Sequence, residues 1–322
     1  MTLLFQVLFA FLGLCLALWS ISAAAVLLTP LPSDPWRDPT QQTDSEYVRA
    51  SDGADLFVRH WLPSGQARQV VLALHGLGQH SGYHRRFGER MAESGIAYFA
   101  FDIRGNGLTR TPHGDVPSVE RLYADVEDVV QFLRRRHPAT PLYVLGHSMG
   151  AAMAATWAAE RKPEINGLLI ISPAMTATAA AVPWLNYLKG PAAWLLFPHR
   201  PVLGISATAY ARSRLSTIYN VPAEVEFVAE DTLHLQRMSI RFALAANYFR
   251  TRAITLASQI RLPTLTLVGQ PDPARLGAQQ FFEALAVADK ALVVIPDLGH
   301  MVFQVQEMPL VLDRVVMWLQ AH

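Results

Sequence analysis

The feature that most constrains the fold of this chain is Ser148, at the centre of a Gly-His-Ser-Met-Gly motif at residues 146–150. An apolar run at residues 142–145 leads into the motif, and an alanine-rich run with high helical propensity follows it. This order is typical of a nucleophile elbow, a sharp strand-to-helix turn that lifts a serine hydroxyl clear of a sheet. The turn is so tight that a Cβ atom at either glycine position would collide with the neighbouring backbone. The motif therefore predicts that Ser148 is a nucleophile.

Apolar runs and amphipathic segments alternate through most of the chain. The runs that predict strands are residues 70–74, 97–103, 142–145, 167–171, 264–268 and 291–295, with a hairpin at 46–50 and 55–62. The segments that predict helices are residues 84–94, 119–136, 274–287 and 303–320. Strands that alternate with helices indicate an α/β fold, in which a mostly parallel central sheet is covered by helices on both faces.

The alternation stops between about residues 175 and 250, where helical patterns continue without strand-like runs. Trp184, Trp194 and Phe197 are among the apolar side chains of its first half, and they are our candidates for substrate binding. An insertion between strands lies at the carboxyl edge of the sheet, where α/β proteins bind ligands. We interpret this region as a helical lid over an acyl pocket. Ordinary helix core is the alternative for most of its apolar residues.

The N-terminus is apolar, and no charged residue precedes Asp34. As a helix, residues 3–28 would be about 39 Å long, enough to cross about 30 Å of hydrocarbon. The expected organisation is a transmembrane anchor or signal segment at 1–28, a linker at 29–45 and a catalytic domain at 46–322. We expect a single-pass membrane protein with its catalytic domain on the extracytoplasmic side. Cleavage near residues 23–25 is the alternative and would give a secreted or periplasmic protein.

Composition excludes several classes of function. The net charge is +1 and charged residues make up 16% of the chain. The chain therefore has no strong positive electrostatic field that would favour binding of nucleic acid. Cys15 is the only cysteine, which excludes an internal disulfide and a cysteine-based zinc site. His75, His80 and His84 suggest a metal site, but no nearby carboxylate cluster completes one. We expect no metal and no cofactor, and the oligomeric state is left open.

A serine nucleophile needs a histidine to accept its proton and an acid to orient that histidine. Asp272 and His300 each follow a predicted strand closely, so both belong at the edge of the sheet where Ser148 emerges. The order serine, aspartate, histidine is the one that α/β-hydrolases use. Asp297 is an alternative acid, but it follows the same strand as His300 and does not fit that order. We predict Ser148, Asp272 and His300 as the catalytic residues.

Acyl transfer also needs hydrogen-bond donors for the oxyanion that forms on the substrate. The backbone N–H of Met149, directly after the nucleophile, is the first candidate. The second should come from the loop after strand 70–74, and there we predict the N–H of Leu77. The glycines on either side of Leu77 keep this loop free of side-chain obstruction.

Four segments together resemble one branch of a known family. These are His-Gly-Leu-Gly-Gln-His-Ser-Gly at 75–82, Phe-Asp-Ile-Arg-Gly-Asn-Gly at 101–107, the elbow motif at 146–150 and the segment at 230–239. They resemble the monoacylglycerol lipase and lysophospholipase branch of the serine α/β-hydrolases, of the serine aminopeptidase S33 type. The resemblance covers roughly residues 45–320. It implies an α/β-hydrolase fold, with segment 230–239 at the end of the lid.

Some residues depart from the pattern of that branch. Gln79 stands where a glutamate is usual, and Tyr83-His84 replaces Arg-Tyr. We expect these positions near the substrate entrance, so they leave the identity of the substrate open. Asp102 is expected to be structural, with its carboxylate bonded to loop backbone.

The expected activity is that of a serine carboxylic-ester hydrolase (EC 3.1.1.-). Its substrate would be an ester of a single-chain lipid such as a monoacylglycerol or a lysophospholipid, cleaved through an acyl-enzyme intermediate. A serine peptidase and an acyltransferase are alternatives, because the elbow itself is indifferent to substrate. A non-catalytic binding protein on the same fold is a third. The sequence predicts neither the acyl length nor the head group.

Overall fold

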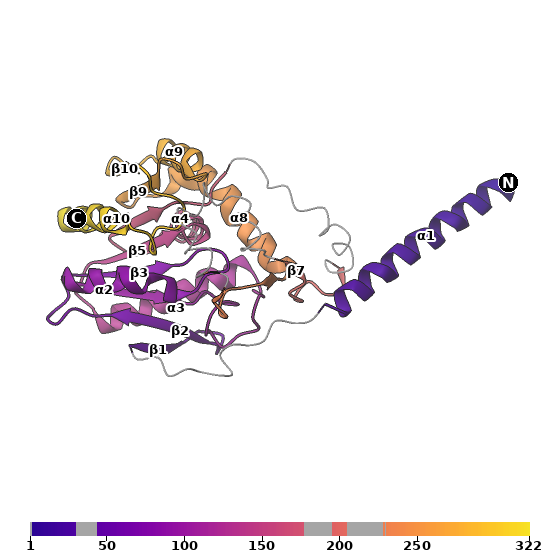
Figure 1. Cartoon of the computed structure of the whole chain (residues 1–322), viewed down its shortest axis with the longest axis horizontal. Helices are drawn as coiled ribbons and strands as arrows, with labels where there is room; N and C mark the ends of the chain where they lie inside the picture. Colours follow the sequence, from indigo (N-terminus) through magenta and orange to yellow (C-terminus); the bar gives the residue numbers. More distant parts are fainter. Residues whose placement is uncertain (1, 30–43, 177–194, 205–227, 229) are drawn as a thin grey trace.

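The computed structural model describes residues 2–29, 44–176, 195–204, 228 and 230–322, with the side chains of the N-terminal helix from residue 11 onward. At its centre is an eight-stranded sheet with the order β1-β2-β4-β3-β5-β6-β9-β10 (Figure 1). The strands are β1 (Ser45–Arg49), β2 (Asp55–Trp61), β3 (Gln69–Leu74), β4 (Ile96–Phe101), β5 (Leu142–His147), β6 (Gly167–Ile171), β9 (Thr264–Gly269) and β10 (Lys290–Ile295). β2 pairs antiparallel with β1 and β4, and the other neighbours are parallel. The predicted mostly parallel sheet is confirmed.

Helices cover both faces of the sheet. The side chains of a strand point alternately to one face and the other, so an apolar strand has residues to bury on both faces. In β3, Val70, Leu72 and Leu74 join one apolar cluster, whereas Val71 and Ala73 join another. The first cluster includes buried residues of α3 (Val119–Arg136), α4 (Met149–Arg161), α8 (Ile240–Leu256) and α9 (Arg275–Ala284). The second includes residues of α2 (Arg85–Glu93) and α10 (Met308–Ala321). A strand buried on both faces reads as a continuous apolar run, which is why β3 was predictable.

The last helix begins later than the sequence predicts. We expect a helix from residue 303, but α10 starts at Met308 after bends and turns at 303–307. Pro309 lies in the first turn of α10. Proline fits there because its missing N–H would have no intrahelical acceptor, whereas it disrupts a helix interior. The apolar residues before Met308 are buried in the core without being helical.

The region predicted as a lid is described only in part. Trp184 and Trp194 lie outside the described residues, and the helical lid stays a prediction. Phe197 packs against an apolar cluster of Val26, Val202 and Leu203. Contrary to the expectation of no strands between 175 and 250, β7 (Leu203–Gly204) and β8 (Arg237–Met238) form a two-stranded antiparallel sheet. Each strand has only two residues, too few for an alternating pattern to show in the sequence.

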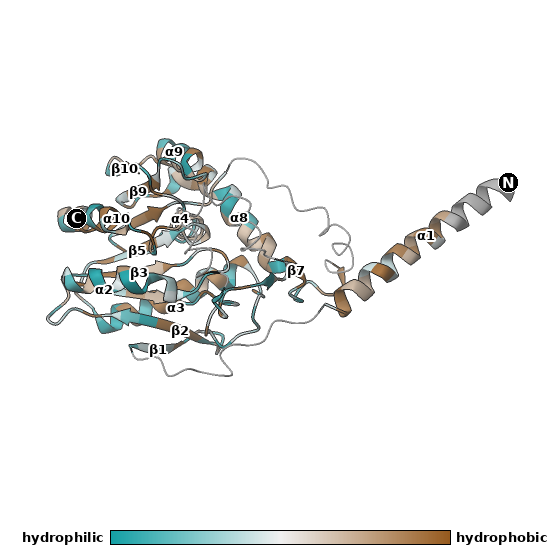
Figure 2. Cartoon of the chain, viewed as in Figure 1, coloured by the Kyte–Doolittle hydropathy of each residue, from teal (hydrophilic) through white to brown (hydrophobic). Residues whose placement is uncertain are grey.

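The N-terminal helix α1 (Thr2–Leu27) projects from the rest of the molecule (Figure 1). Figure 2 shows that the described part of α1 is mostly hydrophobic, whereas α2 and α8 carry both hydrophilic and hydrophobic residues. At its C-terminal end, the Arg200 guanidinium donates hydrogen bonds to the carbonyls of Val26, Leu27 and Thr29. Among the described residues, no helix has the length and apolar character needed to cross a membrane. The predicted transmembrane anchor is therefore not confirmed.

Candidate active site

Ser148 lies at the turn between β5 and α4 in a conformation that side chains rarely adopt. Its φ is 53° and its ψ is −116°, outside the regions that non-glycine residues favour. Such strain persists only where the surrounding structure over-determines it. A Cβ on Gly146 would overlap the backbone of Gly150 and Ala151, and one on Gly150 would overlap the carbonyl of Leu74. The glycines therefore permit the close packing that holds the strained serine in place.

The loops after β9 and β10 bring Asp272 and His300 to Ser148. The Ser148 Oγ lies 2.9 Å from His300 Nε2, and His300 Nδ1 lies 3.0 Å from Asp272 Oδ1. Because the ionised carboxylate can only accept, Nδ1 carries the proton of a neutral imidazole. His300 Nε2 is then free to accept from the serine hydroxyl. This is the arrangement that a general base needs in order to activate a serine.

Charges at the site favour a protonated His300 and an ionised Asp272. Burial opposes the charged form of His300, but the Asp272 carboxylate outweighs burial and raises the pKa of the imidazole. Burial likewise opposes ionisation of Asp272. The charge and hydrogen bond of His300 prevail and lower the pKa of that carboxyl. Asp272 Oδ1 also accepts from the N–H of Ala274 at 2.8 Å, which adds to the stabilisation of the carboxylate. The pair can therefore hold the proton that Ser148 loses.

The structure separates the two candidate acids. Asp272 is buried, with its carboxylate against the imidazole of His300. Asp297 is exposed, with a φ of 58°, in the turn that follows β10. Of the two, Asp272 is the acid that contacts His300, as the chain order predicts.

One predicted oxyanion donor, Met149, directly follows Ser148, and the other, Leu77, belongs to the loop after β3. Met149 is the first residue of α4, so its N–H has no acceptor within the helix. A Cβ placed on Gly76 would lie 3.2 Å from the Cβ of Ser148, so the loop after β3 approaches the nucleophile closely. The N–H of Gly76 itself is bonded to Gln79 Oε1 at 3.0 Å. That bond leaves Leu77, the next residue, as the predicted second donor.

The departures expected near the substrate entrance are buried. Gln79, Tyr83 and His84 are all among the buried residues, and their place near an entrance stays a prediction. His84 Nδ1 lies 2.7 Å from the hydroxyl of Tyr98, a residue of β4. Polar residues between a strand and a helix are usually solvated. The hydrogen-bond partner of His84 belongs to another strand, so the sequence gives no sign that His84 is buried.

The segment that resembles the end of a lid is joined to the loop after β3. His80 Nε2 lies 3.0 Å from Asp231 Oδ2, and the Tyr83 hydroxyl lies 3.1 Å from His234 Nδ1. In addition, the N–H of Leu235 donates to the carbonyl of residue 78 at 2.9 Å. A shift of residues 231–235 would therefore pull on the loop that carries Leu77.

The three histidines that suggest a metal site have separate protein partners. His75 Nε2 accepts from the N–H of Ile103 at 2.9 Å, and its Nδ1 donates to the carbonyl of the next residue. His80 and His84 contact Asp231 and Tyr98, as described above. Within the described part of the chain, no group of three or more histidine, cysteine, aspartate or glutamate side chains is placed to hold a metal ion.

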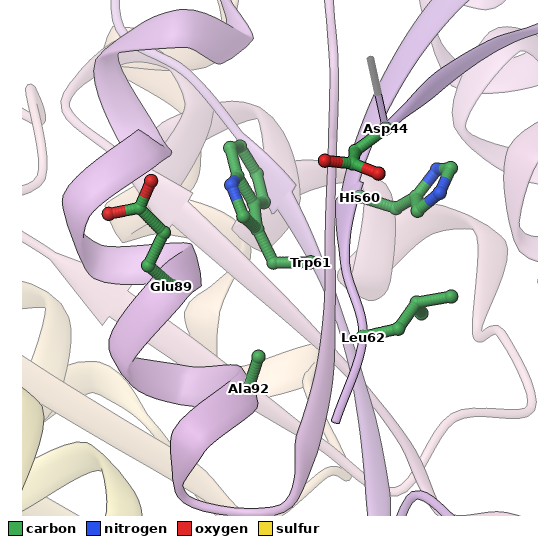
Figure 3. Close-up of a pocket in the computed structure, with 6 residues that line it drawn as sticks. All are labelled: Asp44, His60, Trp61, Leu62, Glu89 and Ala92. Atoms are coloured by element: carbon green, nitrogen blue, oxygen red, sulfur yellow. The ribbon is translucent and has the colours of Figure 1, made fainter. Parts of the chain in front are cut away.

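One cavity lies away from these residues. It has a volume of about 330 Å³ and is formed by the end of β2 and one side of α2 (Figure 3). Its lining residues are Asp44, His60, Trp61, Leu62, Glu89 and Ala92. None of them is a predicted catalytic or oxyanion residue, and we assign the cavity no part in the chemistry.

An elbow serine that emerges from a mostly parallel sheet covered on both faces defines a serine hydrolase of the α/β-hydrolase fold. A sequence model described as serine aminopeptidase, S33, matches residues 65–307, and the chain belongs to this family. The resemblance inferred from the sequence motifs is confirmed, as is the predicted class of enzyme, a serine ester hydrolase.

Relatives and solved structures agree with this family. Human monoglyceride lipase is 26% identical over 293 residues, which cover 89% of this chain and 93% of the relative. A monoacylglycerol lipase of Mycolicibacterium smegmatis is 27% identical and covers 87% of this chain and 98% of its own length. The monoacylglycerol lipase structure from Paleococcus ferrophilus has a TM-score of 0.70 at 24% identity, and covers 83% of this chain and 99% of that one. This last likeness supports the fold alone.

Proposed function

We propose that this enzyme hydrolyses the ester of a single-chain lipid, a monoacylglycerol or a lysophospholipid, with Ser148, His300 and Asp272 as its catalytic residues. The observation that carries the proposal is the continuous contact from Ser148 Oγ to His300 and on to Asp272, at 2.9 and 3.0 Å. The lipid substrate is supported by the monoglyceride and monoacylglycerol lipases among the relatives.

In the first half-reaction, Ser148 Oγ attacks the ester carbonyl while His300 Nε2 takes the hydroxyl proton. The negative charge that forms on the carbonyl oxygen is stabilised by the N–H groups of Leu77 and Met149. His300 then gives its proton to the leaving alcohol, and the acyl group stays on Ser148. Asp272 holds the imidazole in the required tautomer and stabilises its positive charge.

In the second half-reaction, water attacks the acyl-enzyme and His300 accepts a proton from it. Collapse of this second tetrahedral intermediate releases the fatty acid and returns the proton to Ser148. Residues 175–250 are proposed to form the lid over the acyl chain, which would exclude water and hold the ester against the elbow.

A substrate panel tests the proposal. Purified full-length protein would be assayed with long-chain monoacylglycerols, lysophospholipids, a short-chain p-nitrophenyl ester and aminoacyl p-nitroanilides. We expect the highest kcat/KM on a long-chain monoacyl lipid. The family description makes peptidase activity the main rival, so faster cleavage of an aminoacyl anilide would overturn the lipid assignment. Transfer of the acyl group to an added alcohol in preference to water would favour the acyltransferase.

We also propose that residues 1–28 attach the enzyme to a membrane. The support is the lack of any charged residue before Asp34, together with exposed Phe11, Leu12 and Leu14 on α1. The full chain should stay in the membrane pellet after an alkaline carbonate wash. Recovery in the supernatant would contradict attachment. N-terminal sequencing separates an uncleaved anchor from a cleaved signal segment, and protease protection in sealed vesicles reports the side of the membrane.

A further inference from the structure

Gln79 connects the loop after β3 to the nucleophile elbow. Its side-chain Oε1 accepts the N–H of Gly76 at 3.0 Å and lies 3.3 Å from Nδ1 of His147, the residue before the nucleophile. Both Gln79 and His147 are buried. One amide group therefore touches the backbone next to Leu77 and the side chain next to Ser148.

His147 continues this connection to the loop of the catalytic base. Its Nε2 lies 2.9 Å from the backbone carbonyl oxygen of His300, and the two imidazole rings are 5.3 Å apart. The contacts run from Gly76 through Gln79 and His147 to His300. They join three loops that come from β3, β5 and β10, and neither linking side chain has a role in the proposed reaction.

The partners fix where the protons lie. A carbonyl oxygen can only accept, so Nε2 of His147 carries a proton, and an N–H can only donate, so Oε1 of Gln79 faces Gly76. A neutral His147 then turns an unprotonated Nδ1 toward Oε1, so these two acceptors are in contact at 3.3 Å without a hydrogen bond between them. Burial and the nearby His300 lower the pKa of His147 to about 3, so the imidazole is neutral at physiological pH. The bond to His300 is therefore the strong link of His147.

We propose that Gln79 and His147 are positioning residues that hold the loop of Leu77 and the loop of His300 in register with Ser148, with His147 kept as the neutral Nε2–H tautomer. This inference rests on the proposed catalytic residues. It gives the glutamine at position 79 a reason, because a carboxylate there would offer His147 Nδ1 a charged acceptor and favour a second proton. A displacement of about 1 Å at either loop is enough to slow acyl transfer by on the order of a hundredfold.

The first test removes the acceptor at position 79. Gln79→Met keeps the length of the side chain but leaves the buried N–H of Gly76 unpaired. We expect kcat on p-nitrophenyl butyrate to fall by about tenfold or more, with KM within about twofold of the parent. Gln69→Met is the matched control, because Gln69 bonds to the carbonyl of Leu319 at the other end of β3. A parental kcat in Gln79→Met, or a change in KM alone, would overturn the proposal.

The second test reads the protons directly and needs no change in activity. In the parent protein at pH 7, ¹⁵N NMR of His147 should show a neutral ring protonated at Nε2. In Gln79→Glu, the ring should gain a second proton, because the carboxylate offers Nδ1 a charged acceptor. A proton at Nδ1 alone in the parent, or an unchanged ring in Gln79→Glu, would overturn the proposal even if Gln79→Met does not fold.

Ser148→Ala separates this inference from the function on which it rests. If that variant keeps its esterase activity, the proposed catalytic residues are wrong. If Ser148→Ala is inactive while Gln79→Met matches Gln69→Met, only the positioning role is wrong.

Discussion

Two polar regions lie at the carboxyl edge of the sheet. In the loop after β4 the charged groups hold the loop in shape, whereas around Ser148 they form a chain of contacts with the proposed nucleophile. In the loop after β4, the Asp102 carboxylate accepts the N–H groups of Ser81 and Leu108 at 2.6 and 2.7 Å. Arg104 is buried and makes two bonds to Asp125, at 2.7 and 2.8 Å. Every one of these charged groups has partners from the protein itself, as expected of residues that hold a loop in shape. Asp102 thus has the structural role that the sequence predicts.

Around Ser148 the backbone is strained. The Ser148 hydroxyl contacts His300, and its residue has a positive φ without being glycine. His300 and Asp272 have pKa values shifted in opposite directions by their contact. Strain and displaced pKa values are features that cluster where chemistry occurs. The comparison distinguishes two kinds of polar region. Charged groups whose hydrogen bonds come from the protein itself hold a loop in shape, whereas a strained backbone that carries a reactive side chain indicates a site of chemistry.

The largest effect should come from Ser148→Ala. Loss of the nucleophile should lower kcat on a monoacyl ester by about 10⁴- to 10⁶-fold, because the remaining groups cannot form an acyl-enzyme. Ser94→Ala, at a half-buried serine bonded to its own helix, is the control and should match the parent. Turnover in Ser148→Ala close to that of the control would remove the distinction between the two regions.

Asp272→Asn should come next, with a loss of about 10⁴-fold in kcat, since the amide no longer fixes the imidazole tautomer. The pH profile gives the sign. His300 must be neutral to act, so activity of the parent should rise with pH through a midpoint above 6.5, the ordinary value for histidine. Without the carboxylate only burial acts on His300, and the midpoint of the residual activity should fall below 6.5. An unchanged midpoint would show that Asp272 does not set the pKa of His300.

Arg104→Met should act on stability and leave the chemistry intact. It removes one of the two arginine partners of a fully buried Asp125, while Arg121 stays 3.1 Å from the same carboxylate, and should lower the free energy of unfolding by about 2–3 kcal/mol. Arg85→Met, at an exposed ion pair with Glu89, should change it by about 0.5 kcal/mol or less. Urea unfolding measures both, and kcat per folded molecule should stay at the parental level. A large loss of kcat in folded Arg104→Met would place the loop after β4 in the reaction.

The smallest effect should be a gain. Ser148→Gly relieves the positive φ of the elbow and should raise the free energy of unfolding by about 1 kcal/mol, while activity is lost. Chemical denaturation of Ser148→Gly and Ser148→Ala should be compared directly. Because both variants lack the hydroxyl, the difference between their free energies of unfolding reports the strain of the positive φ. Equal stabilities would mean that the elbow stores no strain.

Much of the fold was predictable because the information is local. Apolar runs such as the one before Ser148 are the signature of strands buried on both faces, and all six predicted parallel strands form. The start of α10 was predicted too early, since apolar residues at 303–307 continue the pattern without being helical. The two-residue strands β7 and β8 are too short to leave any periodic signal.

The candidate site was predictable where the chain order carries the information. Asp272 and His300 follow strands and can be placed by that alone, and the structure brings both to Ser148. Gln79 and His147 could not be found in this way. Their bonds to Gly76 and to the His300 carbonyl depend on how three loops meet, which no spacing in the sequence records.

The central claim is that Ser148 is an activated nucleophile, and covalent labelling tests it most directly. The purified full-length protein would be treated with a fluorophosphonate at pH 8, digested and mapped by mass spectrometry, with Asp272→Asn treated in parallel. We predict one adduct on Ser148 that forms much more slowly in Asp272→Asn. An unlabelled Ser148 in folded protein, or an adduct on another residue at the same rate in both proteins, would contradict the claim.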